Sequence, residues 1–137
     1  MAATKLTPQE RDMLLDTARK ALKRAYARYS NFTVGAAILT EQGEIFSGCN
    51  VENASYGLTI CAERSAIFTA VQATAGSKLA IRAVAVVNGD EVPCSPCGAC
   101  RQVISEFGES AIVIFKGQHS YQEMPITDLL PETFHLF

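Results

Sequence analysis

The sequence has little that would suit a membrane, a nucleic acid or an export route. No apolar run approaches the roughly 20 residues that a bilayer-spanning helix needs. The formal net charge is −2, which provides no basic surface for a phosphate backbone. The first residues, Met1–Lys5, lack the apolar core of a secretory signal. We therefore expect a cytoplasmic protein with no membrane partner and no polynucleotide partner, and with a small-molecule ligand.

Internal repeats, low-complexity tracts and linkers are also absent. The 137 residues are 48% hydrophobic and 19% charged, a composition that argues against disorder. A chain of this length can bury about two-thirds of its unfolded surface in one core. We therefore expect a single domain over residues 1–137.

The first helix has a strong start signal in the segment Thr7-Pro8-Gln9-Glu10. The signal combines a threonine N-cap, a proline at the first helical position and a glutamate three residues after the cap. Apolar residues then recur at helical spacing and predict the face that packs on the core. These residues are Leu14, Leu15, Ala18, Ala21, Leu22 and Ala25.

After this helix, short apolar segments and turn signals predict two strands and then helices alternating with strands. The strands are expected at 33–40, 45–49, 81–87, 111–115 and 121–124. The second should run antiparallel to the first, and the last should lie at an edge. Helices are expected at 61–73, ended by Gly76, at 97–107, behind a cap signal in Ser95 and Pro96, and briefly after Pro125. This order predicts an α/β fold with a mixed five-stranded sheet in a three-layer α/β/α arrangement.

Four of the five cysteines fall in two short segments, the run Cys94–Cys100 and the sequence C-A-E-R that begins at Cys61. An odd number of cysteines in a chain without export signals favours metal binding over disulfides. Cys97 and Cys100 project from one face of a helix start, and helix N-termini favour thiolates. Three sulfur ligands leave the fourth position of a zinc site open, which is where a catalytic water binds.

Glu63 lies two residues from Cys61, about 200° away on a regular helix. Both side chains can face one metal only if the helix begins within a residue or two of Cys61. In that position the carboxylate can act on the water as a general acid and base. The alternatives are redox chemistry and a closed structural zinc site completed by Cys94 or Cys49, which would leave Glu63 without a role.

These two segments and three further stretches resemble the zinc-dependent cytidine deaminase family, in its short form with three cysteine ligands. The matching stretches are C-A-E-R from Cys61, P-C-G-A-C-R-Q from Pro96, Tyr29–Ala37, Gly48–Tyr56 and Leu129–Pro131. Together they span nearly the whole domain, and their combination is specific where C-x-x-C alone is not. The resemblance implies hydrolytic deamination of cytidine and 2′-deoxycytidine to uridine or 2′-deoxyuridine plus ammonia, by a zinc-activated hydroxide, in pyrimidine salvage.

The resemblance also implies roles by motif position. Cys61, Cys97 and Cys100 become the ligands of one Zn²⁺ per subunit. Glu63 would take the proton of the water, pass it to ring N3 and help to protonate the departing ammonia.

The charge of such a site needs compensation, because three thiolates leave Zn²⁺ with a formal charge of −1. The resemblance implies that Arg64 provides it by hydrogen bonding to ligand sulfurs. Arg101 is a weaker candidate, with a surface role as an equal alternative. Cys94 is then an extra thiol, partly buried beside the ligands, and Cys49 a small core residue on a strand.

A loop after the second strand is expected to recognise the substrate. Asn50 and Glu52 are two apart on an extended segment and so point to one side, where an amide and a carboxylate suit ribose hydroxyls. The resemblance makes them partners of the 3′-hydroxyl and places Phe32 against the base. Backbone groups of Ala62 and Ala54 are implied to contact the base edge.

The resemblance further implies a homotetramer whose pockets are completed by neighbouring subunits. Tyr56 and Phe134 match positions that reach the adjacent subunit's site, although a phenylalanine near the end could also close its own core. His119, in a turn, and His135 are not expected to bind metal.

Other functions remain open at this point. A deaminase of another aminopyrimidine nucleoside, such as an antibiotic analogue, would carry similar motifs, although the segment 50–53 favours ordinary ribose. A zinc-stabilised binding module predicts stoichiometric zinc without deamination. Polynucleotide editing is disfavoured by the acidic balance and by cysteine where editing enzymes usually carry a histidine ligand.

Overall fold

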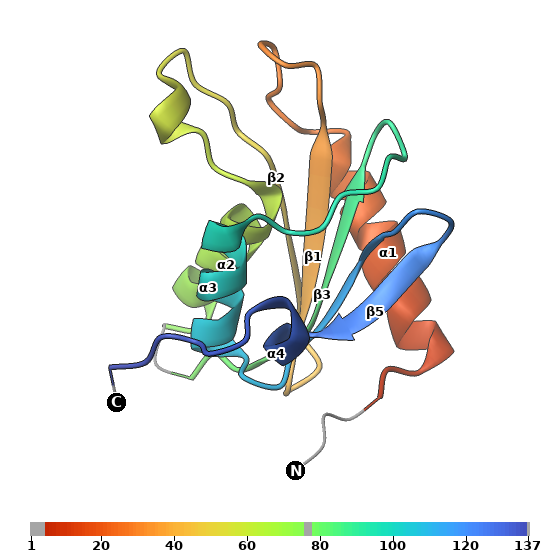
Figure 1. The fold of residues 1–137 in the computed structure, drawn as a ribbon, viewed down its shortest axis with the longest axis vertical. Coiled ribbons are helices and arrows are strands. Elements are labelled where there is room, and N and C mark those ends of the chain that lie inside the picture. The colour runs from red at the N-terminus through yellow and green to blue at the C-terminus, as the bar shows by residue number, and fades with distance from the viewer. Residues whose placement is uncertain (1–4, 76–77, 137) are drawn as a thin grey trace.

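The computed structural model describes residues 5–75 and 78–136 and contains a five-stranded mixed sheet (Figure 1). The strands are β1 (Val34–Thr40), β2 (Ile45–Cys49), β3 (Ile81–Asn88), β4 (Ile112–Lys116) and β5 (Tyr121–Pro125). They are ordered β2-β1-β3-β4-β5, with β3 and β4 parallel and every other neighbouring pair antiparallel. The predicted mixed sheet, the antiparallel first pair and the edge position of the last strand are all confirmed.

Helices cover both faces of this sheet, so the predicted three layers are confirmed (Figure 1). Helix α1 (Pro8–Leu22) packs on one face, and α2 (Ala62–Ala73) and α3 (Gly98–Phe107) pack on the other. Two short elements complete the fold, the 3₁₀ turn η1 (Tyr56–Leu58) and α4 (Ile126–Leu129). Among the described residues, each helix is too short or too polar to cross a bilayer.

Helix α1 begins as the sequence predicts. The Thr7 hydroxyl accepts the Glu10 N–H at 3.1 Å, and the Glu10 carboxylate accepts the Thr7 N–H at 2.9 Å, so the capping box is complete. The same carboxylate accepts a hydrogen bond from Arg82 of β3, which fixes the helix to the sheet. The predicted core residues Leu14, Leu15 and Ala18 are buried, whereas Ala21, Leu22 and Ala25 are only partly buried because the helix ends at Leu22.

On the opposite face, α2 lies close to the sheet because a glycine faces it. A Cβ built on Gly48 of β2 would lie 2.4 Å from the backbone nitrogen of Ala66, a distance that two such atoms cannot adopt. The glycine therefore lets the helix backbone approach the strand directly. This close contact fixes the position of α2, and of Cys61 at its N-terminus, relative to the sheet.

Three local predictions need correction or lie outside the described part. Helix α3 starts after Cys97, which is its N-cap, and not after Ser95 with Pro96 as first helical residue. The thiol replaces the expected hydroxyl because its sulfur accepts the Cys100 N–H at 3.5 Å. Cys49 is only partly buried, because it ends β2 beside the Arg24 carbonyl. The predicted helix end at Gly76 falls outside the described residues.

Candidate active site

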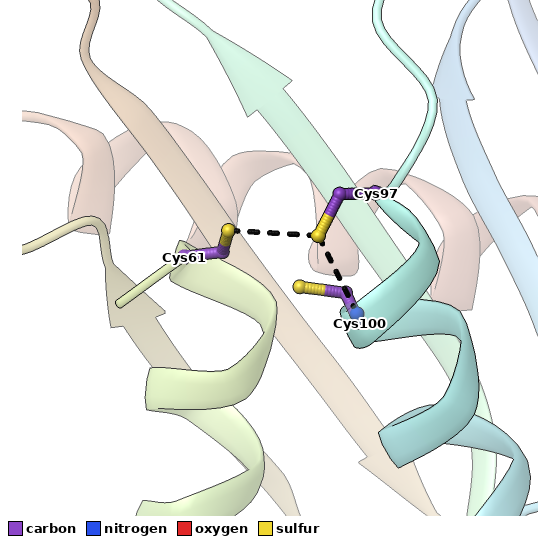
Figure 2. A group of neighbouring side chains, drawn as sticks. All are labelled: Cys61, Cys97 and Cys100. Carbon is purple, nitrogen blue, oxygen red and sulfur yellow. Dashed lines mark hydrogen bonds between the residues drawn. The ribbon is translucent and has the colours of Figure 1, made fainter. Parts of the chain in front are cut away.

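Three cysteine sulfurs meet between the N-termini of α2 and α3. Cys61 is the N-cap of α2, Cys97 is the N-cap of α3, and Cys100 lies in the first turn of α3. Their Sγ atoms all lie within 4.8 Å of one another, and those of Cys61 and Cys97 are 3.8 Å apart (Figure 2). Within residues 5–75 and 78–136, this is the one group of three or more potential ligand side chains close enough to share a metal ion.

The geometry of this group fits zinc. Sulfurs bound at about 2.3 Å in a tetrahedron lie ~3.8 Å from one another, which matches the separation of Cys61 and Cys97. Neither Cys94 nor Cys49 belongs to the group, so the alternative of a closed four-cysteine site is not formed by the described residues. Three soft ligands with a fourth position left for solvent are the pattern of a catalytic zinc site.

The helix start at Cys61 resolves how Cys61 and Glu63 can face one centre. The backbone of Cys61 is extended, with φ −71° and ψ 155°, and helical geometry begins only at Ala62. The two side chains are therefore not separated by the 200° of a regular helix. The predicted position of the helix start, within two residues of Cys61, is confirmed.

Cys61 is the thiol of this group that most readily loses its proton. The pKa of Cys61 is lowered to about 5, chiefly because the Cys100 thiol hydrogen-bonds to it and also because Arg64 and Cys97 donate to its sulfur. The pKa of Cys100 is raised, because this thiol keeps the proton that it shares with Cys61. Cys61 and Cys100 thus share one negative charge, which can attract a divalent cation.

Arg64 lies next to this negative charge. Its Nη2 donates to the Cys61 sulfur at 3.4 Å, and contacts with both Cys61 and Cys100 raise the pKa of its guanidinium. Its Nε is buried without a hydrogen-bond partner within the described residues. The guanidinium therefore lies where it can offset the excess negative charge of three thiolates.

Glu63 is the one carboxylate buried at the centre, with 4% of its surface exposed. Its pKa is raised to about 7, first because burial disfavours the charged form and then because of the nearby Cys61. A carboxyl group that titrates near neutral pH can both accept and donate a proton there. This is the behaviour that a general acid and base needs.

A cavity of about 210 Å³ opens beside the sulfurs and carries several of the predicted residues. Phe32, Asn50, Ala62 and Glu63 line it together with Cys61 and Cys97 of the cluster. The cavity lies at the end of the sheet where β3 finishes, because Val34 at the start of β1 pairs with Asn88. Open α/β sheets bind ligands at the carboxyl ends of their parallel strands.

The residues predicted to contact the sugar are divided between two hollows. Asn50 lines the cavity, is buried, and bonds the backbone on both sides of Thr33. Glu52 lines an adjoining hollow of about 300 Å³ with Tyr29 and Ser30, and Thr59 belongs to both. The two side chains therefore bond to the same segment at different points, and Glu52 does not line the cavity that Asn50 lines.

Three further predicted residues do not reach the cavity of their own chain. Ala54 is exposed, Tyr56 is 80% exposed beside Glu52, and Phe134 is 66% exposed beside Gln102 of α3. The alternative that Phe134 closes its own core is therefore wrong. Their side chains are free to contact a neighbouring molecule.

Some residues of the site carried no clear signal in the sequence. Thr59 and Val86 line the cavity, and Val86 could have been inferred from its place near the end of a buried strand. Cys94 lines it too, and burial raises the pKa of its thiol, so its predicted place beside the ligands is confirmed. Arg101 is neither at the sulfurs nor free on the surface, because it donates to the carbonyls of Pro96 and Leu129.

Comparison with known proteins agrees with this geometry. Residues 8–116 match the family model described as the cytidine and deoxycytidylate deaminase zinc-binding region. A cytidine deaminase from Sporosarcina psychrophila is 45% identical over 125 residues, covering 90% of each chain. The crystal structure of cytidine deaminase from Burkholderia pseudomallei is 45% identical with a TM-score of 0.81, covering 94% of this chain and 100% of that one.

A relative with a different name is also similar. Blasticidin-S deaminase from Bacillus cereus is 36% identical over 103 residues, covering 72% of this chain and 74% of its own. The matched family region includes all three clustered cysteines, the buried Glu63 and most of the sheet. The chain belongs to the cytidine and deoxycytidylate deaminase zinc-binding family.

Proposed function

We propose that the chain, as one catalytic domain over residues 1–137, hydrolytically deaminates cytidine and 2′-deoxycytidine to uridine and 2′-deoxyuridine, with release of ammonia. The reaction belongs to pyrimidine salvage. The observation that carries the proposal is the buried Glu63 beside three clustered cysteine sulfurs, in a cavity that Phe32 also lines. The relatives named cytidine deaminase support the choice of substrate.

Cys61, Cys97 and Cys100 would hold the metal. A zinc ion bound there lowers the pKa of a coordinated water, so that a nucleophile is available at neutral pH. The overall reaction replaces the amino group at C4 of the pyrimidine by oxygen from water, and the exocyclic nitrogen leaves as ammonia.

Glu63 moves the protons of this exchange. Its carboxylate accepts a proton from the attacking water and delivers it to ring N3, which makes C4 a better acceptor of the incoming oxygen. The regenerated carboxylate then takes the remaining proton, that of the new C4 hydroxyl, and passes it to the amino group, which leaves as ammonia while C4 becomes a carbonyl. The raised pKa of Glu63, about 7, suits both directions of transfer.

The cavity walls orient the nucleoside. Phe32 packs against the pyrimidine ring, and backbone groups of Ala62 and Ala54 contact the polar edge of the base. Asn50 and Glu52 bind the 3′-hydroxyl. Each Glu52 oxygen already accepts at least one hydrogen bond from residues 29 and 30, and a carboxylate has capacity for about four, so a substrate hydroxyl can still be accepted.

The active assembly in this proposal is a cytoplasmic homotetramer with one zinc per subunit and pockets shared between subunits. Support comes from Tyr56 and Phe134, whose exposed aromatic rings leave their own cavity and are available to a neighbour. Reduced thiols are also what a cytoplasm maintains. Sedimentation of the active protein should give four chains, and an active monomer would reject shared pockets.

The experiment is an ultraviolet assay of cytidine, 2′-deoxycytidine and their monophosphates, with zinc measured on the same sample. We expect turnover of both nucleosides and one zinc per chain. Zinc at that ratio without deamination of any nucleoside would reject the enzyme and leave a zinc-stabilised binding module.

A second candidate substrate is blasticidin S, favoured by the 36% identity to a blasticidin-S deaminase. It would use the same centre on another aminopyrimidine nucleoside. Including it in the assay separates the two, because turnover of blasticidin S without turnover of cytidine would replace the first proposal by the second.

A further inference from the structure

Phe32 lies in a loop, residues 29–33, that side chains from another segment hold in place. The Glu52 carboxylate binds the start of this loop at three points. Its Oε1 accepts the N–H groups of Tyr29 at 2.9 Å and Ser30 at 3.1 Å, and its Oε2 accepts the Ser30 hydroxyl. The pKa of Glu52 is lowered, chiefly by the Ser30 hydroxyl, so the carboxylate is charged when it makes these bonds.

The Ser30 hydroxyl also bonds to the next part of the loop. Its oxygen accepts the N–H of Phe32 at 2.9 Å. Between them Asn31 has φ 60°, a left-handed conformation that asparagine tolerates better than most residues. The turn brings the Phe32 amide back onto the serine.

The carbonyl of Phe32 is held as well, by the Nδ2 of Asn50 at 2.8 Å. Both backbone groups of Phe32 therefore bond to side chains, although the residue lies just outside β1 and has no place in the strand ladder. These side chains, and not the strand ladder, hold the backbone from which the ring projects.

We propose that Ser30 is a positioning residue that couples Glu52 to Phe32, so that the residues assigned to the sugar and to the base form one connected unit. This inference rests on the proposed function. In this arrangement the carboxylate that would bind the sugar also holds the loop that carries the aromatic ring. Separate sequence motifs do not reveal such a connection.

A substitution of Glu52 alone cannot separate these two roles, since it removes the carboxylate and releases the loop. Ser30→Ala does separate them. It leaves the carboxylate bound to two backbone N–H groups but removes the bridge to the Phe32 amide. Because the hydrogen bond from the Phe32 N–H to Ser30 is exposed, the freed N–H can bind water, and the substitution leaves no buried unpaired group.

The test is steady-state kinetics with cytidine on Ser30→Ala, Ser30→Thr and the control Ser120→Ala, whose hydroxyl lies in the exposed turn before β5. For Ser30→Ala we expect KM to rise about tenfold, near the upper limit for one hydrogen bond, with kcat changed less than about threefold. Zinc content and melting temperature should match the wild type. The threonine variant, which retains a hydroxyl, should restore KM, and the control should be unchanged.

A double-mutant cycle with Phe32→Ala then tests the route. If Ser30 acts through Phe32, Ser30→Ala adds little to the KM of Phe32→Ala. A wild-type KM in Ser30→Ala overturns the proposal, as do fully additive effects or an equal rise in KM for the threonine variant. Failure of the proposed function is distinct, because the wild-type protein would then not deaminate cytidine in the same assay.

Discussion

The helix on one face of the sheet and the two helices on the other begin in different ways. Helix α1 has a complete capping box, in which Thr7 and Glu10 exchange hydrogen bonds. Helices α2 and α3 begin at cysteines. Cys61 makes no capping bond with its side chain, and the sulfur of Cys97 accepts one N–H at 3.5 Å, a poor substitute for an oxygen.

The difference separates a helix start that stabilises the fold from two helix starts that serve the cysteine cluster. At α1, side chains satisfy the N–H groups of Thr7 and Glu10, and the helix is fixed to the sheet through Arg82. At α2 and α3, the positive ends of two helix dipoles face sulfur atoms instead. Those ends, together with Arg64, favour the thiolate charge that a metal centre needs.

The largest effect should follow from giving α3 a hydroxyl group as its N-cap, as α1 has. Cys97→Ser replaces the sulfur ligand with an oxygen, which is a better N-cap and a poorer zinc ligand. We expect loss of stoichiometric zinc and of cytidine deamination. Without metal, the free energy of unfolding of the variant should equal that of the wild type or exceed it by up to ~1 kcal/mol.

Elemental analysis and urea unfolding of both metal-free proteins measure these outcomes. The matched control is Cys49→Ser, a cysteine outside the cluster, which should keep one zinc per chain. Retention of zinc and turnover in Cys97→Ser would show that Cys97 is not a ligand.

A smaller effect is expected from Arg64→Gln, which removes the positive charge at the start of α2. Groups that hydrogen-bond to metal ligands typically contribute about 10–100-fold to metal affinity or activity. We expect a loss of this size in kcat/KM or in zinc affinity, measured by competition with a chelator. Arg24→Gln, at an exposed position, is the matched control. Equal behaviour of the two variants would remove Arg64 from the site.

The smallest effect concerns α1 itself. Thr7→Ala removes the N-cap oxygen and should lower the free energy of unfolding by ~1 kcal/mol, measured by urea denaturation. Activity and zinc content should not change, because α1 packs on the face of the sheet away from the cysteines. Thr7→Ser should restore the stability. A loss of turnover at wild-type zinc content would contradict the separation of the two faces.

The sequence predicted most where local rules act without competition. The start of α1 follows from three residues, and the positions of the strands along the chain follow from short apolar segments, so both were correct within a residue or two. The range of α3 was correct within one residue, but its predicted N-cap, Ser95, was wrong, because the Cys97 sulfur accepts the first-turn N–H of Cys100. The serine instead accepts a hydrogen bond from Arg101.

The site shows the same limit. The cysteine cluster and the buried Glu63 could be predicted, since their spacing is local and their chemistry specific. The bonds from Glu52 to Ser30 could not, because they join segments 22 residues apart through side-chain positions that no pattern encodes. The roles of Tyr56 and Phe134 depend on a second chain.

The most direct test of the account uses Glu63→Gln, since the central claim is that three cysteines hold the metal while Glu63 moves protons. Zinc content and cytidine turnover are measured on the same preparation of variant and wild type. The account predicts one zinc per chain in both, with kcat of the variant reduced by at least ~100-fold, the lower range for loss of a general acid and base. A zinc-loaded variant with wild-type turnover would contradict it.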